Sequence, residues 1–328
     1  MRKLIKRDMV AVKEFDFIDL FAGIGGMRLA LENVGGQCVF SSEIDRFARK
    51  TYSCNFGSVP FGDITGISPK AIPDHDFLVA GFPCQPFSTG GMSTLRFLEK
   101  SDGFNYKNSG ELFFEIARIL QQKTPKMFLL ENVGNLKSHD KGKTFRIIIE
   151  VLKEKYEVFS NLMGSEWAVP QRRNRFFIAG FVKPYQGKFQ FPDPPPNKKP
   201  PVLKDILEHR VDPKYTLKPN TWKWLKGHRE KHQNRGNGFG FSLVDPQTDN
   251  PTRTLSARYH KDGSEILIDQ RDKLPRKLTP RECARLMGFD DKFTIPVSDT
   301  QAYRQFGNAV VVPVVQNIAK AMIRDLEI

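Results

Sequence analysis

The 328-residue sequence has few cysteines and no long apolar run, and each shortage excludes a class of protein. Its four cysteines, Cys38, Cys54, Cys84 and Cys283, lack the paired spacing of a disulfide framework or a zinc site. Such cysteine usage favours a reducing cytosol. The basic start, residues 1–7, is followed by no apolar stretch long enough for a signal peptide or a membrane span. We therefore expect a soluble, cytoplasmic protein that has no metal site.

Acidic residues are also scarce, with 37 Asp and Glu against 51 Lys and Arg, which leaves a net charge of +14. This balance favours a polyanionic partner, nucleic acid first, although a generic basic enzyme would share it. The length suffices for one large and one smaller domain. A proline-rich stretch at 189–201 (FQFPDPPPNKKPP) predicts the boundary. We predict a first domain at 1–190, completed by the C-terminal segment 303–328, and a second at 191–302.

A glycine turn follows the first predicted strand, residues 15–21 (FDFIDLF), and precedes a short helix. Such a turn lets the backbone approach a nucleotide closely, but the spacing of Gly23 and Gly25 is not the GxGxxG of dinucleotide-binding proteins. The next strand ends at Glu43, where a carboxylate is placed to accept both hydroxyls of a ribose. An ordinary solvated glutamate is the alternative. The acid of GDIT, Asp63, either accepts from an adenine amino group or caps a helix.

A buried strand, residues 76–81, ends just before Cys84, which lies between two prolines. A free cysteine is most often a small core residue, but a thiol at the carboxyl end of an α/β strand also suits a nucleophile. Glu131 closes another apolar strand (PKMFLLENV) and brings a carboxyl group to the same region. The intervening polar loop, residues 89–109, has the length of a lid or binding loop.

Two basic segments remain. QRRNR contains Arg172, Arg173 and Arg175 directly before a strand, where arginines hold phosphate or base oxygens unless they form a solvated face. Residues 202–275 are basic and interleaved with aromatic residues. We interpret them as glycine-punctuated loops that read base edges in a major groove, with a solvated basic surface as the alternative.

The ordered set FIDLFAGIGG, Glu43, GDIT, GFPCQPFS, ENV, QRRNR, RKLTPRECARLMGF and QFGNAV resembles the DNA (cytosine-5)-methyltransferase family over essentially the whole chain. The resemblance implies an α/β fold, a Rossmann-like S-adenosylmethionine-dependent methyltransferase sheet with a smaller, mainly irregular or β target-recognition domain. The second half looks like the Dcm/EcoRII branch, whose members methylate the inner cytosine of CCWGG, where W is A or T. Cousins of that branch read CCNGG or CCGG. The resemblance implies double-stranded DNA as the partner and a cognate restriction endonuclease as a possible second one. It also implies a monomer, the usual form of the family.

The resemblance also implies roles for single residues. Cys84 would add to carbon 6 of a flipped-out cytosine, which makes carbon 5 nucleophilic. Glu131 would bind ring nitrogen 3, Arg175 the cytosine carbonyl oxygen, and Arg173 would support the site. The implied S-adenosylmethionine pocket comprises Phe21, Gly23, Gly25, Glu43, Ile44, Asp63, Ile64, Pro83, Leu112 and Asn308. Because many relatives carry a tryptophan at position 44, we expect adenine stacking to be weaker here by on the order of 1 kcal/mol.

The resemblance points to DNA contacts as well. Ser88 begins a loop that looks like the mobile loop of the family, and Arg235, Arg253 and Arg258 are our candidates for reading guanine.

Three rival functions are weighed against this assignment. An RNA (tRNA) cytosine-5 methyltransferase is disfavoured by the basic region at 202–275, since RNA-directed relatives have a shorter element there. A non-catalytic DNA-binding relative would lack a nucleophile, acid or cofactor residue, and none is missing. A nicotinamide-dependent oxidoreductase is disfavoured by the glycine spacing.

Overall fold

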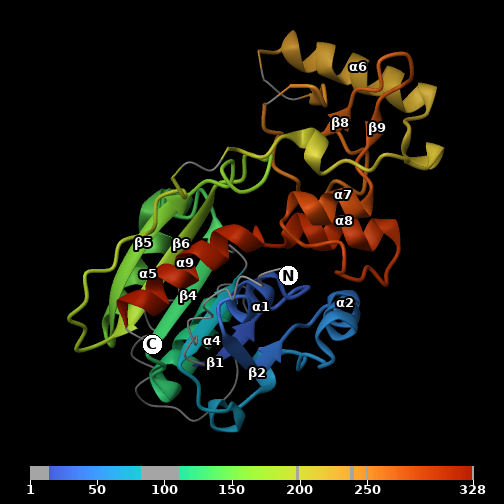
Figure 1. The fold of residues 1–328 in the computed structure, drawn as a ribbon. Coiled ribbons are helices and arrows are strands. Elements are labelled where there is room, and N and C mark those ends of the chain that lie inside the picture. Colours follow the sequence, from blue (N-terminus) through green and yellow to red (C-terminus); the bar gives the residue numbers. More distant parts are fainter. Residues whose placement is uncertain (1–14, 83–110, 197–198, 237–239, 249, 327–328) are drawn as a thin grey trace, which may run out of the picture.

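The computed structural model describes residues 15–82, 111–196, 199–236, 240–248 and 250–326. Its centre is a six-stranded sheet with the order β2-β1-β3-β4-β6-β5 (Figure 1). The strands are β1 (Phe15–Leu20), β2 (Gly36–Ser42), β3 (Phe77–Gly81), β4 (Met127–Val133), β5 (Tyr156–Met163) and β6 (Arg175–Val182). The first four are mutually parallel, and β6 runs antiparallel to both β4 and β5. The predicted α/β fold with a parallel-rich sheet is confirmed.

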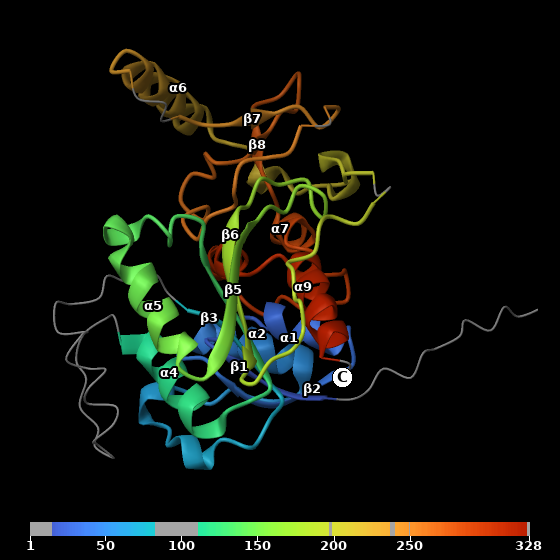
Figure 2. The ribbon, with the colours of Figure 1, turned by 90° about the vertical axis from the view of Figure 1, so that its left-hand side faces the viewer.

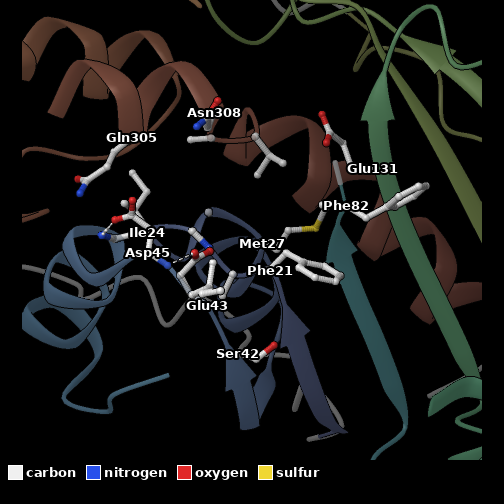
Figure 3. A pocket seen from close by; sticks show the side chains of 18 of the residues that line it. Phe21, Ile24, Met27, Ser42, Glu43, Asp45, Phe82, Glu131, Gln305 and Asn308 are labelled. Carbon is white, nitrogen blue, oxygen red and sulfur yellow. Dashed lines mark hydrogen bonds between the residues drawn. The ribbon is translucent and has the colours of Figure 1, made fainter. Parts of the chain in front are cut away.

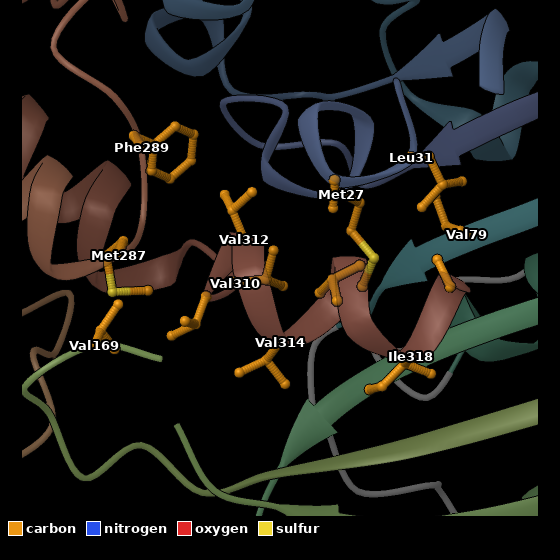
Figure 4. Close-up of a cluster of buried hydrophobic side chains, with 14 of the residues drawn as sticks. Met27, Leu31, Val79, Val169, Met287, Phe289, Val310, Val312, Val314 and Ile318 are labelled. Carbon is orange, nitrogen blue, oxygen red and sulfur yellow. The ribbon is translucent and has the colours of Figure 1, made fainter. Parts of the chain in front are cut away.

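Helices cover both faces of this sheet, so its strands are apolar almost throughout. In β3, Phe77 and Val79 belong to one hydrophobic cluster, whereas Leu78 and Ala80 belong to the other. Helices α4 (Glu111–Lys123) and α5 (Lys143–Lys153) cover one face, and α1 (Gly26–Glu32) and α9 (Val312–Asp325) cover the other (Figure 2). Figure 4 shows Met27 and Leu31 of α1 facing Val310, Val312 and Ile318. The C-terminal segment thus packs against the N-terminal α/β unit.

The connections place the candidate residues at one edge of the sheet. The glycine turn follows β1, Glu43 follows β2 just before α2 (Arg46–Phe56), and Gly81 ends β3. In β4, Glu131 pairs directly with Gly81. Because β6 is antiparallel to β4, its first residue, Arg175, pairs with Val133 and lies at the same edge. This edge is where open α/β sheets bind their ligands.

A smaller unit stands above this edge in Figure 1. It holds α6 (Pro219–Gln233) and the two-residue strands β7 (Leu243–Val244), β8 (Leu267–Ile268) and β9 (Arg276–Lys277). Its own apolar cluster is small: Leu217, Leu225, Phe241 and Leu267. The irregular chain and short strands agree with the predicted fold class. Helix α6 lies in a stretch that the sequence predicts to be loops. Pro219 occupies its first turn, where proline favours a helix start.

The chain then returns to the sheet through α7 (Pro280–Leu286) and α8 (Asp299–Asn308). A capping box of Thr279 and Glu282 starts α7. By length and composition alone, the stretch Asp299–Asp325 could cross a membrane, but 61% of its most apolar window is buried inside the fold. Its apolar character therefore belongs to core helices, of which α9 is the main one.

Candidate active site

A cavity of about 560 Å³ lies at the carboxyl edge of the sheet. Most residues of the predicted cofactor pocket line it: Phe21, Gly23, Glu43, Ile44, Asp63, Ile64, Leu112 and Asn308. Glu131, Arg173 and Arg175, the predicted catalytic residues, line the same cavity. In Figure 3, Glu131 lies at one end beside Phe82, while Glu43 and Asp45 lie near the other. Pro83, Cys84, Ser88 and the predicted loop at 89–109 lie outside the described residues.

Gly25 is the described member of the predicted pocket that does not line the cavity. Its φ of 87° is in the left-handed region, and a Cβ atom there would overlap the ring of Phe56. Gly25 therefore shapes the turn. Phe21 also has a positive φ of 54°, unusual for an aromatic residue, and its ring is exposed to the cavity (Figure 3). This strained turn is what presents Gly23 and Ile24 to the cavity.

Two backbone groups hold the carboxylate of Glu43. The N–H of Gly23 donates to Oε2 at 2.8 Å, and the N–H of Asp45 donates to Oε1 at 2.7 Å (Figure 3). Glu43 thereby bridges the glycine turn and the start of α2, so it is not a freely solvated glutamate. Each oxygen keeps a second acceptor position. The carboxylate can therefore accept two further hydrogen bonds from a ligand in the cavity.

The residues around the predicted adenine end differ in their exposure. Ile64 is buried, whereas Ile44 is 71% exposed at the mouth of the cavity. Asp63 accepts the N–H of Thr65 through Oδ1 at 3.0 Å and so caps the short helix η1 (Ile64–Gly66). Capping was one of the two roles that the sequence left open for Asp63, and the residue also lines the cavity.

Glu131 and Arg175 form an ion pair, with Nε of Arg175 3.0 Å from Oε1 of Glu131. Both side chains are mostly buried, at 13% and 19% exposed. Burial raises the pKa of the Glu131 carboxyl, while the charges of Arg175 and Arg173 act in the opposite direction. A carboxyl group with a raised pKa beside a cavity is suited to hold or deliver a proton.

Arg173 is a buried cation with three carbonyl partners. Its Nη1 donates to Leu255 at 2.8 Å, and its Nη2 donates to Gly307 at 3.0 Å and to Ala309 at 2.7 Å. Burial lowers its pKa to about 9, which still leaves the guanidinium protonated at neutral pH. Arg173 thus ties the start of β6 to the small unit and to the end of α8.

Two buried amides were not singled out in the sequence, although they stand within the ENV and QRRNR motifs. Asn132 donates through Nδ2 to the carbonyl of Phe82 at 2.9 Å and so fixes the chain directly before Pro83. Gln171 accepts the N–H of Leu255 at 2.7 Å and donates to the carbonyl of Leu286 at 3.2 Å. The sequence signal that could have identified these two amides is their position in the same motifs as the candidate catalytic residues.

The predicted DNA-reading arginines lie elsewhere. Arg235, Arg253 and Arg258 are all exposed on the smaller unit and do not line the cavity. Arg253 donates to the carbonyl of Gly240 at 3.0 Å. Within the described ranges, no group of three or more His, Cys, Asp or Glu side chains could hold a metal ion.

The fold is that of a methyltransferase. The S. pombe Dnmt2 methyltransferase superimposes with a TM-score of 0.77 at 21% identity, covering 96% of this chain and 100% of that one. The Entamoeba histolytica methyltransferase EhMeth gives a TM-score of 0.75 at 22% identity, covering 96% and 99%. At these identities the likeness concerns the fold alone.

Sequence comparison then defines the family. The C-5 cytosine-specific DNA methylase family matches residues 15–324. The chain is 48% identical to the type II methyltransferase M.DsaV of Dactylococcopsis salina, over 96% of this chain and 88% of that protein. Identity is 50% to M1.ScrFI of Lactococcus lactis subsp. cremoris, covering 96% and 79%. It is 45% to the DNA-cytosine methyltransferase of Escherichia coli K12, covering 94% and 77%.

The chain belongs to the C-5 cytosine-specific DNA methylase family and is a DNA (cytosine-5)-methyltransferase. The resemblance stated from the motifs, including its relation to the Dcm branch, is confirmed.

Proposed function

We propose that this enzyme transfers a methyl group from S-adenosylmethionine to carbon 5 of the inner cytosine of CCWGG in duplex DNA, with CCNGG as the second candidate. The observation that supports this best is the shared cavity, whose lining combines the predicted cofactor residues with Glu131, Arg173 and Arg175. The motifs that resemble the Dcm/EcoRII branch support CCWGG as the DNA target sequence.

The residues present fit S-adenosylmethionine. The free acceptor positions of Glu43 suit the two ribose hydroxyls, and the backbone at Gly23 leaves open space where a side chain would intrude. Asp63 and Ile64 would contact the adenine, and Pro83, Leu112 and Asn308 would close the pocket. When bound, this cofactor supplies an electrophilic methyl group. The high exposure of Ile44 is consistent with the weaker adenine stacking expected from the sequence.

The chain's own residues would then act on the cytosine. In the proposed mechanism the thiolate of Cys84 adds to carbon 6, which turns carbon 5 into a nucleophile. Cys84 follows Gly81 by three residues, and Gly81 pairs with Glu131. Glu131 would hydrogen-bond ring nitrogen 3 and supply a proton there, for which its raised pKa is suited. Arg175 would hold the carbonyl oxygen, and Arg173 would support it. Loss of the proton from carbon 5 and elimination of the thiol complete the reaction.

The DNA side of the proposal follows from the same site. A cytosine inside a duplex cannot reach a cavity at the edge of the sheet, so the target base is flipped out. Ser88 and the exposed Arg235, Arg253 and Arg258 are the proposed DNA contacts. We also propose a cytoplasmic, monomeric enzyme of bacterial or phage origin that works alone or beside a restriction endonuclease.

Bisulfite sequencing of DNA from cells that express the protein tests substrate and sequence together. Methylation at CCAGG and CCTGG but not at CCGGG or CCCGG is the expected result. Methylation at all four would replace CCWGG by CCNGG, and a preference for tRNA over duplex DNA in vitro would overturn the assignment. Cys84→Ser should abolish methylation while it leaves sequence-specific DNA binding intact; normal turnover would remove Cys84 from the mechanism.

A further inference from the structure

The solvent-facing side of α6 carries an unusual combination of side chains. A shallow hollow on this side is lined by Asn220, Lys223, Trp224, Gly227, His228 and Lys231, which we call the α6 outer stripe. Their spacing of three and four residues places them on one face of the helix. Trp224 is 56% exposed, although large apolar side chains are normally buried. The stripe therefore presents a flat indole flanked by two lysines.

The charges of α6 are nearly all of one sign. It contains Lys223, Lys226, Arg229 and Lys231 against a single acid, Glu230. Neither Lys223 nor Lys231 forms an ion pair with any part of the chain that the structure describes. Two exposed lysines that form no ion pair with the described residues favour an anionic partner.

The inner side of α6 is joined to a candidate base-reading residue. The guanidinium of Arg229 lies over the ring of Phe241, 4.8 Å from its centroid, and its side chain packs against Gly240. The carbonyl of Gly240 in turn accepts a hydrogen bond from Arg253. Helix α6 and Arg253 therefore both contact the segment that contains Gly240 and Phe241. In Figure 2, α6 and the upper end of α5 project toward the same side of the molecule.

We propose that the α6 outer stripe binds the phosphate backbone of duplex DNA that flanks the target sequence. The eight helical steps from Lys223 to Lys231 span about 12 Å along the helix. This length corresponds to three or four phosphates of one strand, at about 3.4 Å of rise each. The indole of Trp224 then lies against the sugars between the two contacts and can donate its N–H to a phosphate.

An anionic membrane is the less suitable partner for this surface. Interfacial helices bury a broad apolar face, whereas Trp224 is the single large apolar residue exposed on α6 within the described chain. The inference rests on the proposed function in one respect, because it takes duplex DNA as the substrate.

The salt dependence of DNA binding tests this surface. Binding of the full-length protein is measured from 50 to 200 mM salt, on a target duplex of about one helical turn and on one of about three turns. Each phosphate contact contributes about 0.9 to the salt slope. Replacing both lysines by glutamine (K223Q/K231Q) should therefore lower the slope on the long duplex by about 1.8, which makes the loss of affinity over this range about tenfold smaller. On the short duplex, binding and methylation should be unchanged.

The matched control is K70Q/K320Q, which removes two exposed lysines from the sheet domain and should leave both slopes unchanged. Thermal unfolding establishes that both variants fold. Equal slopes for wild type and K223Q/K231Q on the long duplex would overturn the proposal. So would an equal change on both duplexes, because the lysines would then contact the target itself. If wild type instead methylates neither duplex, the proposed function has failed, independently of α6.

Discussion

Replacing Arg173 by methionine tests how much this buried cation contributes to the free energy of unfolding. The change leaves the carbonyls of Leu255, Gly307 and Ala309 without their donor in a buried setting. Hydrogen bonds to a charged group contribute about 1.5–3 kcal/mol each, so three of them set a ceiling near 9 kcal/mol. The cost of burying the guanidinium offsets part of this sum. We expect the free energy of unfolding to fall by about 3–5 kcal/mol, because each buried carbonyl left without a donor costs about 1–3 kcal/mol.

Urea-induced unfolding followed by circular dichroism measures this loss, and Arg175→Met is the matched control. Arg175 is more exposed and, among the described residues, makes one ion pair, with Glu131, and one bond to the carbonyl of Asn174. We expect its removal to lower stability by no more than about 2 kcal/mol but to abolish methylation. The reasoning is refuted if Arg173→Met unfolds within about 1 kcal/mol of wild type, or if the two variants lose equal stability.

Three further predictions concern carboxyl groups. Glu131→Gln should slow single-turnover methylation; since burial raises the pKa of Glu131, the wild-type rate should decline as pH rises through that pKa, and the variant should lack this limb. Glu43→Ala should weaken S-adenosylmethionine binding about 10- to 100-fold in calorimetry, because it removes a charged acceptor from the ribose site; an unchanged Kd would exclude Glu43 from that site. Asp19 is fully buried, and burial raises its pKa to about 8. The folded protein therefore holds a proton that the unfolded chain releases near pH 4, so stability should fall by about 1.4 kcal/mol per pH unit between these values. Asp19→Asn should flatten that slope in urea titrations at several pH values.

The sheet and its chemistry were largely predictable because their signals are local. Continuous apolar runs marked β1, β3 and β4, and the glycine turn followed from residues 22–26. Helix α6 was missed for an equally local reason. Leu225 is its single buried residue, so the stretch shows no apolar periodicity to indicate a helix. Its position depends instead on packing against Phe241 and Leu267, which are distant in sequence.

The partners of the candidate residues were harder to foresee than the residues themselves. Glu43 and Glu131 could be placed at strand ends from the pattern alone. Their different surroundings could not be predicted from that pattern. Glu43 accepts two backbone N–H groups, whereas Glu131 is buried against Arg175. Residue spacing indicates which element carries a side chain, but the contacts form only when distant segments pack.

The contacts of QRRNR show why this motif occupies the junction between the two parts of the molecule. Leu255 is held on both sides, because its N–H donates to Gln171 and its carbonyl accepts from Arg173. Two residues earlier stands Arg253, a candidate for reading the target sequence. The second terminal nitrogen of Arg173, Nη2, donates to the carbonyls of Gly307 and Ala309, which flank the cavity-lining Asn308. One buried side chain therefore fixes the segment proposed to read DNA relative to the wall of the cavity proposed to hold the cofactor, and a shift in either segment has to break a charged hydrogen bond.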